Sequence, residues 1–235
     1  MITKFDSLFA GHTDLDNVGY GGTPINERRY ANAHLATALS KAESMAKLMD
    51  DLGYNCFWLA EHHFQHEGTE CIPNTILMAL HLAHRTKNIK IGPIELGERL
   101  CFGFHFYMAN SREQGMKEAA KYYEENMKMF GELRLVRAIT EEQMEIMRDP
   151  KRAPTAKLPR IEDAVKAGGF LCGNADNLIE HIKALEKKYP ALDRISVSLS
   201  VGVPEKVALE QLDRFAKEVM PAFKEAKAPQ PMLVR

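Results

Sequence analysis

An uninterrupted apolar run at residues 56–60 constrains the fold of this chain more than any other feature. A strand that is apolar at every position is typical of a parallel sheet covered on both faces, whereas an antiparallel strand with one wet face alternates. The run ends at once in Glu61, His62 and His63. Because ligands collect at the carboxyl ends of parallel strands, we expect this strand to deliver an acid and two imidazoles to a functional site.

The segments around this run alternate between strand and helix patterns. Residues 5–10 and 89–91 have the composition of short strands, and residues 27–52 place apolar side chains at the three- and four-residue steps of an amphipathic helix. A further helix begins at Pro73. The strand, helix, strand order implies right-handed crossovers. The first part of the chain therefore predicts an α/β barrel or an open doubly wound sheet.

The same alternation returns later in the chain. Strands are predicted at residues 100–109 and 195–201, and helices at 111–130, 174–189 and 205–223. The segment 132–173 has three prolines and only two short helical pieces, around 141–147 and 160–167. We expect it to be an irregular, mobile or lid-like connection.

Both late strands have a period of two. One face of the first carries Gly103, His105 and Tyr107, opposite a row of phenylalanines, and one face of the second carries Ser196, Ser198 and Ser200. Alternation of this kind indicates that one side of each strand meets small, polar or wet surroundings. Either the interior of a barrel or an open, solvated sheet accounts for it.

Composition narrows the function classes. The 31 basic and 32 acidic residues give a formal charge of −1, so no whole-chain field favours nucleic acid or an anionic membrane. Charged residues follow the N-terminus too soon for a signal peptide, and nowhere do ~18 uncharged apolar residues run together. Four cysteines without C-x-x-C spacing are interpreted as reduced and structural: Cys56, Cys71, Cys101 and Cys172. We expect a cytoplasmic protein that binds a small molecule.

Polar residues follow two of the expected strands. Gly11 and His12 come after the first strand and open a glycine-rich loop, residues 11–26, that is longer than most connections. His62 follows the second strand and is the strongest catalytic candidate, because an imidazole exchanges protons near neutral pH and Glu61 could orient it. A structural histidine at a strand end is the plainer alternative.

A metal site is a second alternative. Glu61, His62, His63 and His66 are dense in ligand types, and His12 could join them from the neighbouring strand end. The helical H-E-x-x-H pattern is absent, however, and adjacent histidines at a strand end point to opposite sides. The glycine motifs that cradle phosphates and the G-x-S-x-G motif of serine hydrolases are also absent.

The chain resembles the bacterial luciferase-like family of flavin-dependent monooxygenases. Three segments carry the resemblance: residues 53–64, with the run FWLAEHHF; residues 5–12, FDSLFAGH; and residues 84–92, HRTKNIKIG. The segment 167–173 before a helix is similar to the C-terminal part of such proteins. The family fold is a (β/α)₈ barrel, so the resemblance implies a TIM-barrel-like α/β fold.

The resemblance implies a function and a site. Family members bind reduced FMN at the carboxyl ends of the strands and use oxygen to oxidise an organic substrate, and the cofactor carries the oxygen chemistry. His62 matches the family's active-site histidine, near the reactive C4a position of the flavin, and Glu61 and His63 match its neighbours on the pocket wall. Gly11 and His12 lie at the adjacent strand end and complete the expected cofactor-binding set.

The chain departs from the family in its middle. Full barrels need ~250 residues or more, and here Gly92 passes directly through Pro93 into a segment that resembles the approach to the seventh strand. Two explanations stay open: a shortened member with an open barrel, or a central segment that the printed sequence omits. We expect one luciferase-like domain over residues 1–235, with βα units 1–92 and 93–235.

Three function hypotheses result. The first is an FMNH₂-dependent monooxygenase that takes a small organic substrate and oxygen, with a flavin reductase as a partner. The second is a shortened, non-catalytic flavin- or ligand-binding protein of the same fold, and the third a metal-dependent hydrolase. Because family members commonly pair through early helices and an incomplete barrel exposes apolar surface, we also expect a homodimer.

Overall fold

All strands that the structure describes belong to one parallel sheet. The computed structural model describes residues 2–61, 66–69, 71–92, 101–132, 140–190 and 192–224. Within them the strand order is β3-β2-β1-β6-β4-β5, and every neighbouring pair is parallel. The strands are β1 (Lys4–Phe9), β2 (Cys56–Leu59), β3 (Lys90–Ile91), β4 (Cys101–Met108), β5 (Phe170–Gly173) and β6 (Arg194–Ser198).

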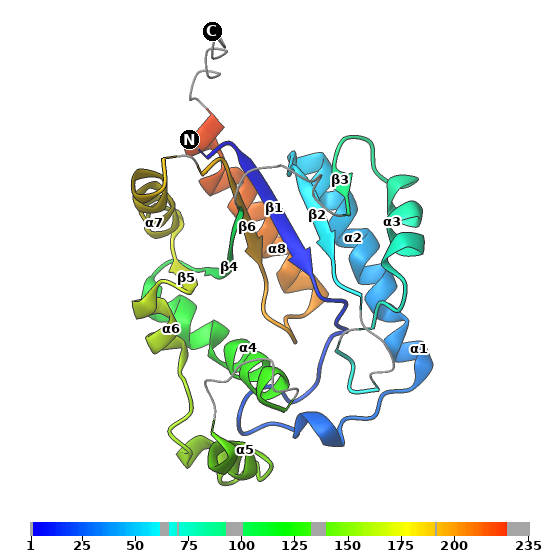
Figure 1. Ribbon diagram of the computed structural model, residues 1–235, viewed down its shortest axis with the longest axis vertical. Coiled ribbons are helices and arrows are strands. Elements are labelled where there is room, and N and C mark those ends of the chain that lie inside the picture. The colour runs from blue at the N-terminus through cyan, green and yellow to red at the C-terminus, as the bar shows by residue number, and fades with distance from the viewer. Residues whose placement is uncertain are drawn as a thin grey trace, which may run out of the picture.

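Helices connect these strands (Figure 1). They are η1 (Ile25–Glu27), α1 (Asn32–Leu35), α2 (Thr37–Leu52), α3 (Thr75–Ala83), α4 (Arg112–Glu132), α5 (Glu141–Met147), η2 (Ala153–Thr155), α6 (Ile161–Ala167), α7 (Ala175–Lys188), α8 (Glu205–Arg214), η3 (Phe215–Val219) and α9 (Pro221–Lys224). No described helix is both long and apolar enough to cross a membrane.

The sheet is barrel-like in its pairing but not closed. The first strand, β1, pairs with β2 on one side and with the last strand, β6, on the other, as in a (β/α) barrel. In the described residues, however, β3 and β5 remain at the two edges, and β6 lies between β1 and β4. The expected class, a TIM-barrel-like luciferase-type fold that is incomplete after the third strand, is confirmed.

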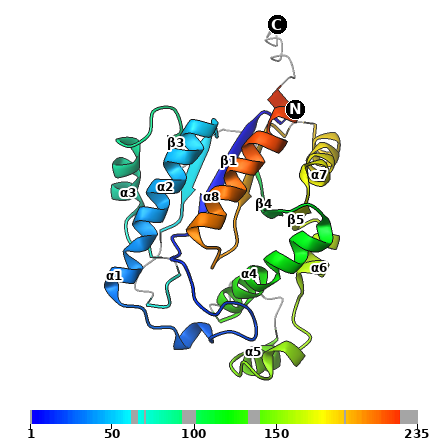
Figure 2. The same ribbon diagram turned by 180° about the vertical axis from the view of Figure 1, so that it is seen from behind.

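One face of the sheet carries the hydrophobic core. Figure 2 shows α2 and α8 lying across this face, and Phe5 from β1 meets Phe215 and Phe223 at ring distances of 5.8 and 5.7 Å. On the opposite face of β1, which Figure 1 shows without a described helix over it, Leu8 is 42% exposed. The alternation expected for β4 and β6 is confirmed, because His105 and Ser198 are register partners, on the opposite side from the paired Phe104 and Val197.

The helix predicted at residues 27–52 is wrong at its start. The long helix begins at Thr37, after the single turn of α1, and ends at Gly53 with φ 75°. Arg28 is extended and buried, and its guanidinium donates to the carbonyl oxygens of Asp16 and Asn17. This tertiary anchoring overrides the local helical pattern, so the loop after β1 is longer than predicted.

The segment 132–173, which was predicted to be an irregular connection, contains a strand. Phe170–Gly173 forms β5 at the sheet edge by pairing with β4, although a four-residue run beside two glycines gives no local strand signal. The two short helices, α5 and α6, are confirmed. Ser111 caps the start of α4, because its hydroxyl accepts the Gln114 N–H at 3.1 Å. The last predicted helix is divided by the π-type turn of η3.

A buried charge cluster fixes the long loop to α4. Glu125, 0% exposed at its side chain, pairs with Arg28 at 3.2 Å and with Lys128 at 2.8 Å. It also accepts the Gly19 N–H at 3.0 Å, and Lys128 donates to the Gly19 carbonyl. The loop that follows β1 is therefore held against α4, a helix from a much later part of the chain.

Candidate functional site

The segments that follow β1 and β2 join into one rim. The Gly11 carbonyl accepts the Cys71 N–H at 2.5 Å, and the Gly68 carbonyl accepts both the Thr13 N–H, at 2.8 Å, and the Thr13 hydroxyl, at 3.0 Å. The rim lies at the carboxyl ends of two adjacent parallel strands, where sites form in this architecture.

Gly11 is a glycine because the rim is tight. Its φ is 78°, a left-handed conformation that other residues adopt at a cost. A Cβ at this position would lie 2.8 Å from Cγ1 of Ile72. Gly11 therefore allows the segment after β1 to lie close to the segment after β2. Its contact with a cofactor stays a prediction.

His12 is buried within this rim. Its side chain is 3% exposed, and its ring lies 4.9 Å from that of Phe9. Among the described residues, neither ring nitrogen has a hydrogen bond of normal geometry. Burial lowers the pKa of His12 well below its usual value, and the charge of Lys41 lowers it further. The ring is therefore neutral at pH 7, with one donor and one acceptor.

His105 extends the polar surface to β4. It lies beside Ser198 in the sheet and stacks on Phe170 at 6.3 Å. Burial lowers its pKa to about 4, so this ring is also neutral at pH 7. The alternation of β4 marked His105 as facing away from the helices, but nothing in the sequence linked it to His12, because that proximity depends on β6 lying between β1 and β4.

Glu61 binds the start of a helix. One of its carboxylate oxygens accepts both the N–H and the hydroxyl of Thr75, each at 3.1 Å. Asn74 caps the same helix, α3, by accepting the Leu77 N–H. A carboxylate at a helix N-terminus is favourable for the dipole, so Glu61 secures the end of β2 to α3. Its expected place on a flavin-pocket wall stays a prediction.

The main catalytic prediction falls outside the described residues. His62 and His63 belong to the segment 62–65, which the structure does not describe, and so does Pro93 at the junction after Gly92. Of the predicted site residues, the structure places Gly11, His12 and Glu61 at the carboxyl ends of β1 and β2.

The described part of the chain does not assemble a metal site. No group of three or more His, Cys, Asp or Glu side chains within it could hold an ion. Its buried cations are each paired with a carboxylate: Arg28 and Lys128 with Glu125, Lys41 with Asp14, and Arg194 with Asp6.

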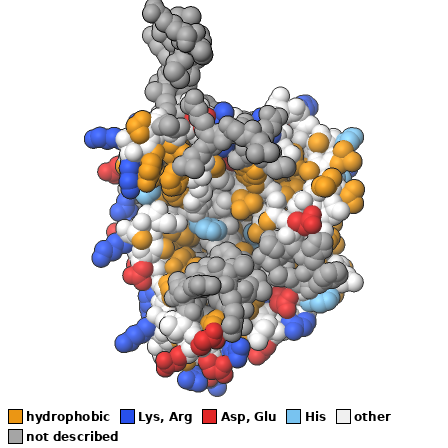
Figure 3. Space-filling model, in the orientation of Figure 1, with side chains coloured by type: hydrophobic (Ala, Val, Ile, Leu, Met, Phe, Trp, Pro, Cys, Tyr) orange, Lys and Arg blue, Asp and Glu red, His pale blue; other side chains and the backbone are white. Residues whose placement is uncertain are grey.

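An apolar surface adjoins the rim. Leu8 and Trp58 are register partners on the face of β1 and β2 that no described helix covers (Figure 1), and the Trp58 indole N–H donates to Asp6 at 3.1 Å. A second apolar surface lies on α3, where Ile76, Leu77 and Leu80 are 78%, 65% and 58% exposed. Figure 3 shows hydrophobic side chains gathered over α3 at the edge of this face.

Residues 21–93, which contain β2 and the part of the rim that follows it, match a family model described as luciferase-like monooxygenase. The resemblance to this family is confirmed. The uncharacterized protein YwcH of Bacillus subtilis (strain 168) is 33% identical over 70 residues, which are 30% of this chain and 19% of that relative. The chain therefore covers less than two thirds of the relative's length.

Solved structures extend the likeness of fold to nearly the whole chain. The oxygenating constituent of 3,6-diketocamphane monooxygenase from Pseudomonas putida, a type II Baeyer–Villiger monooxygenase in complex with FMN, has a TM-score of 0.61 at 12% identity and covers 98% of this chain and 100% of its own. Apo-MsnO8 has a TM-score of 0.58 at 11% identity, covering 96% and 100%. At these identities the likeness shows the fold alone.

Proposed function

We propose that this chain is an FMNH₂-dependent monooxygenase that oxidises a small organic substrate with molecular oxygen. The match of residues 21–93 to luciferase-like monooxygenases carries the proposal, because the matched segment contains the strand end with Glu61, His62 and His63. In this proposal His62 is the catalytic residue beside the flavin. Glu61, His63, His12 and Gly11 form the wall that holds it.

The described residues fit the ring of a flavin better than its phosphate. Leu8 and Trp58 offer an uncovered apolar surface, and the neutral imidazoles of His12 and His105 offer uncharged hydrogen-bonding groups. A planar ring with polar edges suits such surroundings. The buried cations are already paired, so they do not form a ready phosphate site.

Reduced FMN would supply the electrons that activate oxygen, and the protein would position the ring and exclude water. The rim between β1 and β2 fixes the backbone on either side of His62, through Glu61 on one side and Gly68 on the other.

A non-catalytic flavin-binding protein is the second candidate, and the open sheet favours it. A monooxygenase must exclude water to protect reactive flavin species. Leu8, on the face of the sheet proposed to hold the flavin, is 42% exposed, so water can reach this face. Flavin binding without substrate-dependent oxygen consumption would select this candidate.

Two measurements test the proposal. Titration of the full chain with FMN, followed by flavin fluorescence, should show saturable binding. Replacement His62→Ala should lower FMNH₂-dependent turnover by orders of magnitude, whereas His84→Ala, at the exposed residue that follows α3, should leave it unchanged. Unchanged turnover in His62→Ala would remove this residue from the mechanism, and absent flavin binding would exclude both candidates.

The partners follow from the same proposal. A flavin reductase would supply FMNH₂. The four cysteines form no disulfide, which suits the reducing cytoplasm in which the enzyme would work. We also propose a homodimer in which α2 and α3 pair with the same helices of a second copy. Leu77 lines one hollow with Leu39 of α2, and Ile76 and Leu80 are exposed on the same helix as Leu77, so a two-fold axis would bury this apolar surface against itself.

A further inference from the structure

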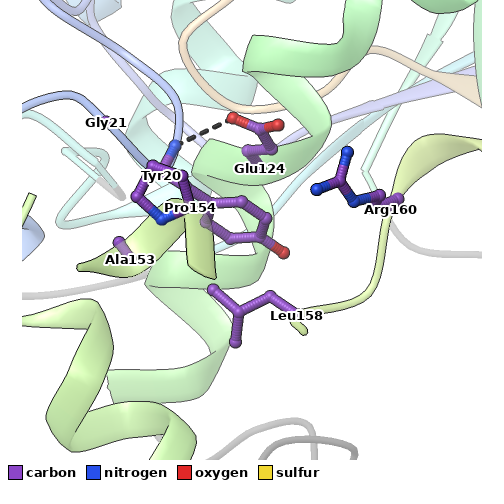
Figure 4. Close-up of a pocket in the computed structure, with 7 residues that line it drawn as sticks. All are labelled: Tyr20, Gly21, Glu124, Ala153, Pro154, Leu158 and Arg160. Atoms are coloured by element: carbon purple, nitrogen blue, oxygen red, sulfur yellow. Dashed lines mark hydrogen bonds between the residues drawn. The ribbon is translucent and has the colours of Figure 1, made fainter. Parts of the chain in front are cut away.

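A small cavity lies between the long loop, α4 and the segment before α6. Its volume is about 190 Å³. Figure 4 shows its lining residues, which come from three separate parts of the chain: Tyr20, Gly21, Glu124, Ala153, Pro154, Leu158 and Arg160. None of them belongs to the rim that follows β1 and β2, so the cavity is a different place from the proposed flavin site.

One wall of the cavity is rigid and apolar. The Tyr20 hydroxyl donates to the Pro159 carbonyl at 2.7 Å, and the Tyr20 N–H donates to Glu124 at 2.9 Å. Tyr20, Ala153 and Leu158 are all buried and pack in one hydrophobic cluster. Because both ends of Tyr20 are held, its ring forms a fixed surface.

The other two walls carry opposite charges. Figure 4 shows the Arg160 guanidinium to one side of the Tyr20 ring and the Glu124 carboxylate at the backbone end of Tyr20, beside its N–H. The two side chains line the same cavity without an ion pair between them, and Arg160 is exposed. Both charges reach Tyr20, whose pKa is raised first by burial, then by Tyr123 and Glu124, and opposed by Arg160.

This arrangement discriminates between ligands by charge. A simple anion would be attracted by Arg160 and repelled by Glu124, and a simple cation would meet the reverse. A molecule with a carboxylate at one end and an ammonium group at the other complements both walls. Each end would form a charge-assisted hydrogen bond, the stronger kind in proteins.

We propose that this cavity binds a small zwitterion of the amino-acid class, with its carboxylate on Arg160, its ammonium group on Glu124 and its carbon skeleton on Tyr20 and Leu158. The volume of about 190 Å³ lies below the ~300–1,000 Å³ of pockets for drug-sized ligands, so the ligand is a small metabolite. Because Tyr20 follows Gly19, which Glu125 holds, an occupied cavity would also stabilise the loop that begins at the rim.

Isothermal titration calorimetry on the full chain tests the proposal with three matched probes: β-alanine, propionate and propylamine. They share a short skeleton and carry both charges, the carboxylate alone and the ammonium alone. We expect β-alanine to bind about tenfold more tightly than either singly charged probe, since one charged hydrogen bond contributes at least that factor.

Variants assign the two ends of the ligand. Arg160→Gln should lower β-alanine affinity about tenfold and leave a preference for propylamine, and Glu124→Gln should give the mirror result with propionate. The amide of the second variant can still accept the Tyr20 N–H, so the wall is retained. Arg152→Gln, an exposed arginine outside the lining, is the control and should bind as the unmodified chain does.

Three outcomes would overturn the proposal: no heat of binding with millimolar β-alanine, equal affinity for all three probes, or an affinity that neither variant changes. Circular dichroism on each variant separates lost binding from lost folding. Flavin titration of the same samples keeps the two sites distinct, because a failure here with intact flavin binding leaves the proposed monooxygenase untouched.

Discussion

The carboxylate of Asp6 in the first strand accepts a hydrogen bond from the Arg194 guanidinium in the last strand at 2.7 Å, with side chains 0% and 4% exposed. The Trp58 indole donates to the same carboxylate oxygen. One buried charge pair thus joins β1, β2 and β6 at the centre of the sheet. Of these three residues, only Trp58 lies in the segment that matches the family model.

Removing one partner of this pair should be costly. We expect Asp6→Ala to lower the free energy of unfolding by about 3–5 kcal/mol, because it breaks a buried ion pair and removes the carboxylate oxygen that accepts from both Arg194 and Trp58. Asp193→Asn, which removes the partly exposed pair with Lys4, is the control and should cost less than about 1 kcal/mol. Urea denaturation measures both, and similar losses for the two variants would contradict the prediction.

Acid should destabilise the protein through its buried imidazoles. The His105 pKa in the fold is about 4, below the ~6.5 of an unfolded histidine. The neutral ring is therefore favoured by folding above pH ~6.5, and this contribution, up to about 3 kcal/mol, is lost as the pH falls from ~6.5 to ~4. The lowered His12 pKa acts in the same direction.

The variant His105→Phe isolates this effect, since phenylalanine can stack on Phe170 and does not titrate. Its unfolding free energy, measured by urea at several pH values, should fall less between pH ~6.5 and ~4 than that of the unmodified chain. Parallel curves for the two proteins would show that His105 does not carry the pH dependence.

The loop after β1 should open when its anchor is removed. Glu125→Ala deletes the partner of two buried cations, Arg28 and Lys128, and also the acceptor of the Gly19 N–H. We expect faster limited proteolysis within the loop and a loss of about 3–5 kcal/mol in unfolding free energy. Glu145→Ala, which removes an exposed pair with Arg148, should change neither measurement.

The proposed dimer depends on the apolar surface of α3. The double change Leu77→Lys and Leu80→Lys places like charges on a surface that a two-fold axis would bring together, so we expect a monomer. Sedimentation velocity at micromolar concentration measures the change. Lys183→Glu on the exposed side of α7 is the control and should remain dimeric, whereas a monomer for the unmodified chain would exclude this interface.

Local pattern predicted most elements because their signals are local. The uniform apolar run of β2 and the helical periodicity of residues 111–130 and 174–189 are properties of residues close together in the chain, and these elements are confirmed. The start of α2 and the strand β5 were missed. Arg28 is held extended by loop carbonyls, and β5 is a strand only because β4 lies beside it.

The features of the candidate site were likewise predicted only in part. The carboxyl-end positions of Gly11, His12 and Glu61 were predicted, since a strand must end where its apolar run ends. The contact of Glu61 with Thr75, the burial of His12 and its proximity to His105 were not, because they depend on residues distant in the chain.

The sequence by itself determined a parallel α/β fold with polar groups at strand ends, since hydrophobic period and strand termination are properties of neighbouring residues. Only the tertiary structure decided that β6 lies between β1 and β4, that the described sheet stays open, and that Tyr20, Glu124 and Arg160 line one cavity. Those outcomes depend on pairings such as Asp6 with Arg194, whose strength comes from burial that the folded chain alone creates.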